Sequence, residues 1–197
     1  GNQTYGGDSS SVANELSENV VSIFHNDGAF VAIKRDTTIV SWGNVEYGGD
    51  INDSTYGIHS NYYFKHGFKY IVGTEKGFTG LQLNGNIVTW GSGYINASSS
   101  NLDVSNHDML HISNIEQVFA NQHTFAGIDT NNKLVTWGND MYNGLYSHQN
   151  YVQDDINTIF TTKTAFAALK QDGTVFTWGD PINGGISSHV SDQLKDI

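Results

Sequence analysis

The chain has 197 residues, with 20 Asp and Glu against 9 Lys and Arg, for a formal net charge of −11. Aromatic residues reach 12% and charged residues only 15%, which is the composition of a folded chain rather than a disordered tail. Binding to phosphate backbones needs clustered basic side chains, so the charge argues against nucleic acid as a partner. No apolar run is long enough for a membrane-spanning helix, so no membrane insertion is expected. The absence of cysteine excludes disulfides, thiolate metal sites and cysteine nucleophiles.

Four tryptophans, each followed by glycine, reveal an internal repeat. They close the similar runs TTIVSWG, GNIVTWG, NKLVTWG and GTVFTWG, at Trp42, Trp90, Trp137 and Trp178. A phenylalanine stands twelve residues before each of them, at Phe30, Phe78, Phe125 and Phe166. Because these aromatic residues recur in every unit inside β-branched runs, we predict that they form the repeated core and do not bind a ligand.

Each unit contains three runs with the composition of short strands. In the first unit they are VVSIF at 20–24, AFVAIK at 29–34 and TTIVSW at 37–42. Turn-forming residues separate the runs, such as HNDG in the first unit and QDG in the fourth. A tail rich in Gly, Asn and Ser follows each Trp-Gly pair and is a candidate for a fourth, outer strand. One or two helical turns are expected within 9–20, and no long helix.

Three or four short antiparallel strands repeated about every 41–42 residues, apart from small insertions, are typical of a β-propeller blade. We therefore predict an all-β array of about four blades that forms one repeat block. Its units are approximately 1–42, 43–90, 91–137 and 138–178, with a terminal tail at 179–197. A β-solenoid is the alternative, but its coils are shorter and lack a hairpin turn within each unit.

The fourth unit, IFTTKTAFAALKQDGTVFTWGD, resembles the repeat of the regulator of chromosome condensation (RCC) family. The tail YGGDSSSV at 5–12 resembles a divergent subfamily with Trp-Gly and Tyr-Gly-Gly-Asp motifs. The resemblance implies a propeller of about seven blades. It implies no single function, because the family includes Ran exchange factors, modules of ubiquitin ligases, bacterial effectors and a beta-lactamase inhibitory protein. The β-wedge and basic face of the exchange factors have no counterpart in this sequence.

The sequence contains five tails but only four segments that run from the repeated Phe to the repeated Trp. Tails begin at Gly1, Gly43, Gly91, Gly138 and Gly179, and GNQTYGGD at 1–8 closely matches GNVEYGGD at 43–50. A ring closed by strand exchange would share one tail between its two ends, whereas here both ends carry one. This surplus, and a first residue other than Met, lead us to expect part of a larger propeller or assembly. Its terminal units should then contact further repeats or another subunit.

The tails also hold the candidate binding residues. Tyr5, Tyr47, Tyr94 and Tyr142 follow the Trp positions by four or five residues, and tails lie at the edge or rim of a propeller. Exposed Tyr beside Gly and Asn favours adaptable protein contacts, and the alternative is that each Tyr caps its own blade. Asp8 and Asp50 are further candidates in these tails. A turn-capping role is favoured over calcium binding, because a stretch such as GGDSSS offers one carboxylate where a calcium loop needs several oxygen donors at close spacing.

No catalytic residue, cofactor or metal is predicted. His107 and His111 form an H-D-x-x-H sequence similar to the zincin motif, but that motif requires a helix and a third ligand. A phosphate-binding loop, a nucleophile elbow and a recurring carboxylate pair are all missing. Asn2, Asn52 and Asn96 lie in glycosylation sequons, which matter only in a eukaryotic secretory route.

The sequence therefore predicts a non-enzymatic scaffold or protein-binding module of propeller type, with another protein as its partner. Two alternatives remain open at this point. One is a regulatory propeller of a small-GTPase exchange factor or a ubiquitin ligase. The other is an extracellular adhesin or sugar-binding array.

Overall fold

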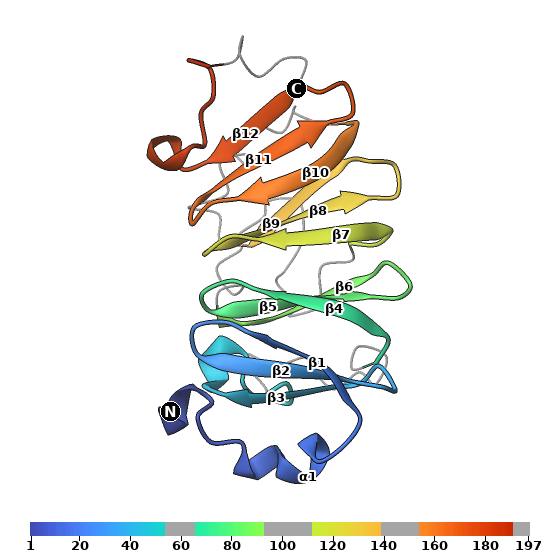
Figure 1. Ribbon diagram of the computed structural model, residues 1–197, viewed down its shortest axis with the longest axis vertical. Helices are drawn as coiled ribbons and strands as arrows, with labels where there is room; N and C mark the ends of the chain where they lie inside the picture. Colours follow the sequence, from blue (N-terminus) through green and yellow to red (C-terminus); the bar gives the residue numbers. More distant parts are fainter. Residues whose placement is uncertain (54–65, 93–111, 139–153, 191–197) are drawn as a thin grey trace.

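The structure is a computed structural model that describes residues 1–53, 66–92, 112–138 and 154–190. Within these ranges it contains four antiparallel three-stranded sheets, which follow one another in chain order along the long axis (Figure 1). Blade 1 consists of β1 (Val20–His25), β2 (Ala29–Lys34) and β3 (Ile39–Gly43). Blade 2 consists of β4 (Phe68–Gly73), β5 (Gly77–Gln82) and β6 (Ile87–Gly91). Blade 3 consists of β7 (Ile115–Ala120), β8 (Thr124–Asp129) and β9 (Leu134–Gly138), and blade 4 of β10 (Ile156–Thr161), β11 (Ala165–Lys170) and β12 (Val175–Gly179).

The remaining elements of the described ranges are short and helical. They are η1 (Gln3–Tyr5), η2 (Ser10–Val12), α1 (Ala13–Leu16), η3 (Val45–Tyr47) and η8 (Pro181–Asn183). The helical turns expected within 9–20 are therefore present. The described tails form 3₁₀ turns and not the outer strand that their composition allowed, so each described blade has three strands. None of the helices in these ranges has the length and apolar character needed to cross a membrane.

The strand register explains the spacing of Phe and Trp. In every blade the second strand places its Phe directly opposite the Trp of the third, as in Phe30 opposite Trp42. The four ring pairs lie 4.9–5.8 Å apart between centroids. All four tryptophans are buried near the end of the third strand, as predicted, and so are three of the phenylalanines. Phe30 of blade 1 is only half-buried.

Three apolar clusters, one at each junction, join the four blades in series. In the first, Ala29, Val31 and Ile33 of β2 pack with Phe78 and Trp90 of blade 2. The same arrangement joins blade 2 to blade 3 and blade 3 to blade 4. Each blade therefore has two distinct faces. We call them the Phe–Trp face, which is turned toward the preceding blade, and the rear face, which is turned toward the following one.

Backbone hydrogen bonds between neighbouring blades reinforce these clusters. The carbonyl of Thr37 accepts from the N–H of Phe68, that of Gly85 from Ile115, and that of Asn132 from Ile156, at 2.9–3.2 Å. Each acceptor is the turn residue between the second and third strands, with a positive φ of 60–81°. The predicted turns thus also present a carbonyl to the next blade. Blades 1 and 4 lie at opposite ends of the molecule, as expected for an open array (Figure 1).

Candidate functional site

The described tails share one local conformation. In each, an Asn or Asp side chain accepts from the backbone N–H two residues later, a 3₁₀ turn follows, and a glycine with positive φ ends it. The capping residues are Asn2, Asn44 and Asp180, and the closing glycines are Gly6, Gly48 and Gly184. Because the cap satisfies a free N–H and glycine tolerates positive φ, the motif G-[ND]-x-x-x-G-G forms this turn from local interactions alone.

Acid should loosen the tail that carries Asp180. The hydrogen bond from the N–H of Ile182, with a further bond from Asn183, holds the pKa of Asp180 below its usual value. The stability linked to this group is therefore complete above the ordinary Asp pKa of 3.8 and is lost as pH falls through the lower folded value. Asp180→Asn keeps the acceptor, so we expect a smaller loss of thermal stability between pH 5 and pH 2. Asn44→Asp should have the opposite effect and add acid sensitivity.

Each of the first two tails docks on the Phe–Trp face of the blade after it. The indole Nε1 of Trp42 donates to the carbonyl of Gly6 at 3.2 Å, and that of Trp90 donates to Gly48 at 3.1 Å. A Cβ atom on Gly48 would lie 2.8 Å from Trp90 and 2.9 Å from Phe78, so a side chain there would collide with the rings. These tails therefore satisfy a buried indole N–H and cover the rings.

The other two indoles differ. Trp137 donates to the Thr79 hydroxyl of blade 2 at 3.2 Å, whereas Nε1 of Trp178 has no hydrogen-bond partner in the described part of the chain. Sequence reasoning placed the tails at the rim but missed this contact with the following blade. The available signal was the glycine that follows five residues after Gly1 and five residues after Gly43, at Gly6 and Gly48.

The structure brings two of the predicted tyrosines together. The rings of Tyr5 and Tyr47 lie 5.8 Å apart in an edge-on arrangement, and Nζ of Lys76 stands 5.8 Å from the Tyr47 ring. Tyr47 also packs closely over Gly28 of blade 1, so it caps that blade while Tyr5 remains 43% exposed. Tyr94 and Tyr142 lie outside the described residues. A binding role for this set stays a prediction.

Asp8 and Asp50 occupy turn-capping positions. Oδ1 of Asp8 accepts from the N–H of Ser10 at 2.9 Å, and Oδ1 of Asp50 accepts from Asn52 at 2.8 Å. The bonds from Ser10 lower the pKa of Asp8. Among the described residues no three His, Cys, Asp or Glu side chains gather to form a metal site. His107 and His111 lie outside those residues, so the absence of bound calcium and zinc stays a prediction.

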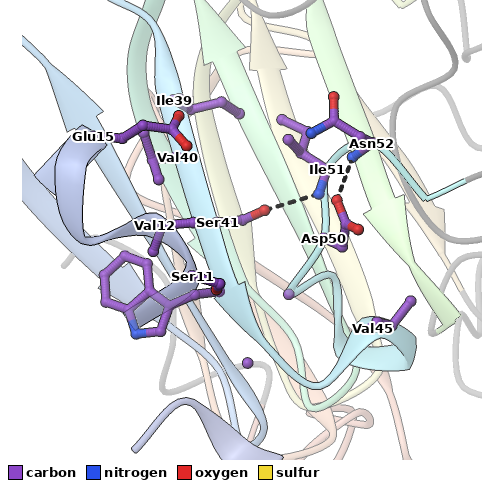
Figure 2. A pocket seen from close by; sticks show the side chains of 13 residues that line it. Ser11, Val12, Glu15, Ile39, Val40, Ser41, Val45, Asp50, Ile51 and Asn52 are labelled. Atoms are coloured by element: carbon purple, nitrogen blue, oxygen red, sulfur yellow. Dashed lines mark hydrogen bonds between the residues drawn. The ribbon is translucent and has the colours of Figure 1, made fainter. Parts of the chain in front are cut away.

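A pocket of about 480 Å³ lies beside β3, between the N-terminal helical segment and the second tail. Figure 2 shows Val12 and Glu15 on one side of this strand and Asp50, Ile51 and Asn52 on the other. The full lining is Ser11, Val12, Glu15, Ile39, Val40, Ser41, Trp42, Gly43, Val45, Gly49, Asp50, Ile51 and Asn52. The pocket is thus formed where two tails meet the first blade.

The pocket combines apolar and polar groups, with acidic side chains on both sides. Val12 and Val45 provide apolar contact area, while Glu15 and Asp50 supply carboxylates and no lining residue is basic. The Ser41 hydroxyl accepts from the N–H of Ile51 at 2.9 Å and holds the second tail against β3. Such a lining fits a ligand with apolar and cationic groups. Sequence reasoning selected Asp50 but missed Glu15, because its position depends on how the short helix packs against β3.

Comparison with solved structures gives propellers at low sequence identity. Human WBSCR16 matches with 16% identity and a TM-score of 0.56, over 87% of this chain and 50% of that one. Prp20p from Saccharomyces cerevisiae matches with 13% identity and a TM-score of 0.52, over 81% and 45%. The ectodomain of the Physcomitrella patens receptor kinase CR4 matches with 16% identity and a TM-score of 0.50, over 81% and 40%.

No protein-family model and no curated protein matches the sequence. The chain spans about half, or less, of the length of these three solved structures. At such low identity the likeness establishes the fold and not an activity. The chain has the all-β fold of part of a β-propeller.

Proposed function

We propose that this chain is a non-enzymatic protein-binding module of propeller type, and that the pocket beside β3 receives a segment of its partner. The observation that carries the proposal is the arrangement of Glu15 and Asp50 on opposite sides of β3, in a pocket where two tails meet the first blade. The tails are connecting segments held by a rigid scaffold of strands, and binding residues are commonly found on such segments.

The lining favours an extended peptide segment with an apolar side chain next to Lys or Arg. The apolar side chain would contact Val12 and Val45, and the cation would lie between the two carboxylates. The formal net charge of −11 increases the attraction of the whole chain for basic segments. Tyr47 belongs to the same turn as Val45, so the Tyr5–Tyr47 pair extends the surface available to a longer segment.

A protein partner is in line with one of the structural neighbours. Prp20p has binding properties to Gsp1p and histones. At 13% identity this supports the idea of a protein ligand and does not identify one.

Peptide binding tests the proposal directly. The probes are fluorescein-labelled decapeptides in a Gly-Ser background, one with Leu beside two Arg and one with Leu beside two Glu. We expect fluorescence anisotropy to show binding of the Arg peptide, weakening as salt rises. The double variant Glu15→Lys/Asp50→Lys should lower its affinity about tenfold or more, because two favourable charge contacts become repulsive.

The matched control reverses two exposed carboxylates outside both the pocket and the Tyr5–Tyr47 surface, Glu116→Lys and Asp154→Lys. It makes the same change in net charge and should leave the affinity within about twofold of the unmodified chain. An equal loss of affinity for the Arg peptide in both double variants would show that binding depends only on the overall charge of the chain. Equal binding of the Glu and Arg peptides would contradict the proposed ligand chemistry.

A further inference from the structure

The N-terminal end of the stack exposes a face that is covered in every other blade. Ile23 of β1 is 58% exposed. Its counterparts in the first strands of blades 2, 3 and 4 are Ile71, Val118 and Ile159, which are 2%, 5% and 3% exposed. Those three residues are buried in the clusters that join their blades to the preceding ones. Blade 1 therefore presents an uncovered part of the Phe–Trp face.

The C-terminal end exposes the complementary face. Phe160 of β10 is 61% exposed, whereas its counterparts Phe24, Val72 and Phe119 pack into the clusters shared with the following blades. Leu169 on the same rear face is only partly buried, although the matching positions of blades 1 to 3 are at most 5% exposed. Blade 4 thus exposes a rear face of the kind that covers the Phe–Trp face of the following blade elsewhere in the chain. Within the described ranges, blade 1 has no such rear face packed against its Ile23.

The backbone groups at the two ends are complementary too. Gly173, with φ of +81°, occupies the turn position whose carbonyl accepts from the next blade in blades 1 to 3. Val20 occupies the position whose N–H donates to the preceding blade in blades 2 to 4. Among the described residues, neither group makes such an interblade bond. Blade 1 therefore offers an apolar face and the N–H of Val20 as a donor. Blade 4 offers an apolar face and the carbonyl of Gly173 as the matching acceptor.

We propose that two copies of this chain associate head to tail, with the rear face of blade 4 in one copy covering the Phe–Trp face of blade 1 in the other. The contact continues the interface that already joins successive blades three times within the chain. A second copy fits because β1 of its blade 1 offers the surface that β4, β7 and β10 offer to the blades before them. The β3 part of that face is already covered by η1 and η2, and Val40 and Trp42 are 4% and 9% exposed. Residues 1–7 keep their place on Trp42, and the new contact lies over β1 and β10.

Two such contacts close the assembly. In a closed pair, the exposed surfaces around Ile23 and Phe160 are covered in both copies. The chain spans about half the length of propellers with the same fold, and two copies supply eight blades, within the roughly four to eight found in propellers. The expected particle has twice the chain mass of 21.6 kDa.

The test combines two single variants, Ile23→Glu and Phe160→Glu, with mass measurement by light scattering after gel filtration. Each variant alone should be monomeric, with a dimer dissociation constant raised at least about 100-fold, because every contact then contains one buried carboxylate. An equimolar mixture should form dimers again, each held by one intact contact, because the other contact would bring the two carboxylates together. In this mixture, the intact blade 4 of the Ile23→Glu chain meets the intact blade 1 of the Phe160→Glu chain.

Val21→Glu is the matched control. Val21 lies in the same strand and is 61% exposed, but its counterparts Lys69, Glu116 and Asn157 are exposed polar residues that face away from the interblade clusters. This variant should dimerise like the unmodified chain. Circular dichroism of all variants checks that the blades are folded.

A second measurement uses the absence of cysteine from the chain. A short bismaleimide should join an Ile23→Cys chain to a Phe160→Cys chain, and should not join two Ile23→Cys chains. A monomeric unmodified chain at the highest soluble concentration would overturn the proposal. So would a dimer that both Glu variants leave intact, or one that the mixture of variants fails to restore.

Discussion

Replacing Phe166 with alanine is expected to lower the free energy of unfolding by about 3–5 kcal/mol. Phe166 is 2% exposed, and its ring stacks on Trp178 at 4.9 Å between centroids with an interplanar angle of 8°. It also belongs to the cluster that joins blade 4 to blade 3. Its removal therefore leaves a cavity between two blades as well as within one. Urea denaturation followed by circular dichroism measures the loss.

Phe160→Ala is the matched control, because it removes the same ring from the neighbouring strand of the same blade. Phe160 is 61% exposed, so its loss should change the free energy of unfolding by less than about 1 kcal/mol. Both variants are compared in an Ile23→Glu background, so that association between chains does not contribute. Equal losses at the two positions would contradict the assignment of Phe166 to the core.

The blades could be predicted from the sequence because their contacts are local. Two strands joined by a short turn form a hairpin whose register depends on the turn, so a fixed spacing of twelve residues places Phe166 opposite Trp178. The alternation of side chains along the strands then determines which residues share a face. The same reasoning correctly placed all four tryptophans in the core.

The role of the tails could not be predicted in the same way. Composition alone allowed an outer strand, a rim loop or a cap. The structure shows a 3₁₀ turn whose glycine carbonyl binds a tryptophan 36 or 42 residues later in the chain. That contact joins the two ends of one repeat unit over a separation that differs between units, so no fixed local spacing encodes it. The position of Glu15 in the pocket beside β3 could not be predicted for the same reason, since it depends on how the short helix packs.

Tyr47 illustrates a case in which two interpretations were both partly correct. The sequence left open whether such a residue caps a blade or lies exposed on the rim. The ring packs over Gly28 and is also within reach of Tyr5 and Lys76. Tyrosine suits both tasks, because it combines a large apolar ring with a polar hydroxyl.

Gly48→Ala tests whether the contact between a tail and the next blade contributes to stability. Two effects oppose a side chain at this position. The backbone has φ of +87°, which costs a residue with Cβ about 1–2 kcal/mol. The added carbon would also lie under 3 Å from the rings of Trp90 and Phe78, and such overpacking costs a further 1–3 kcal/mol or so. We expect the free energy of unfolding to fall by about 2–5 kcal/mol in urea denaturation.

Gly67→Ala separates the two effects. Gly67 also has a positive φ, of +76°, but nothing lies within 4 Å of the position that its Cβ would occupy. This variant should therefore show only the backbone cost of about 1–2 kcal/mol. The excess loss in Gly48→Ala then measures the disturbed packing on Trp90, together with any weakening of its hydrogen bond to the Gly48 carbonyl. If both variants lose the same amount, the tail lies against blade 2 without stabilising it, and the four blades must hold together through their faces alone.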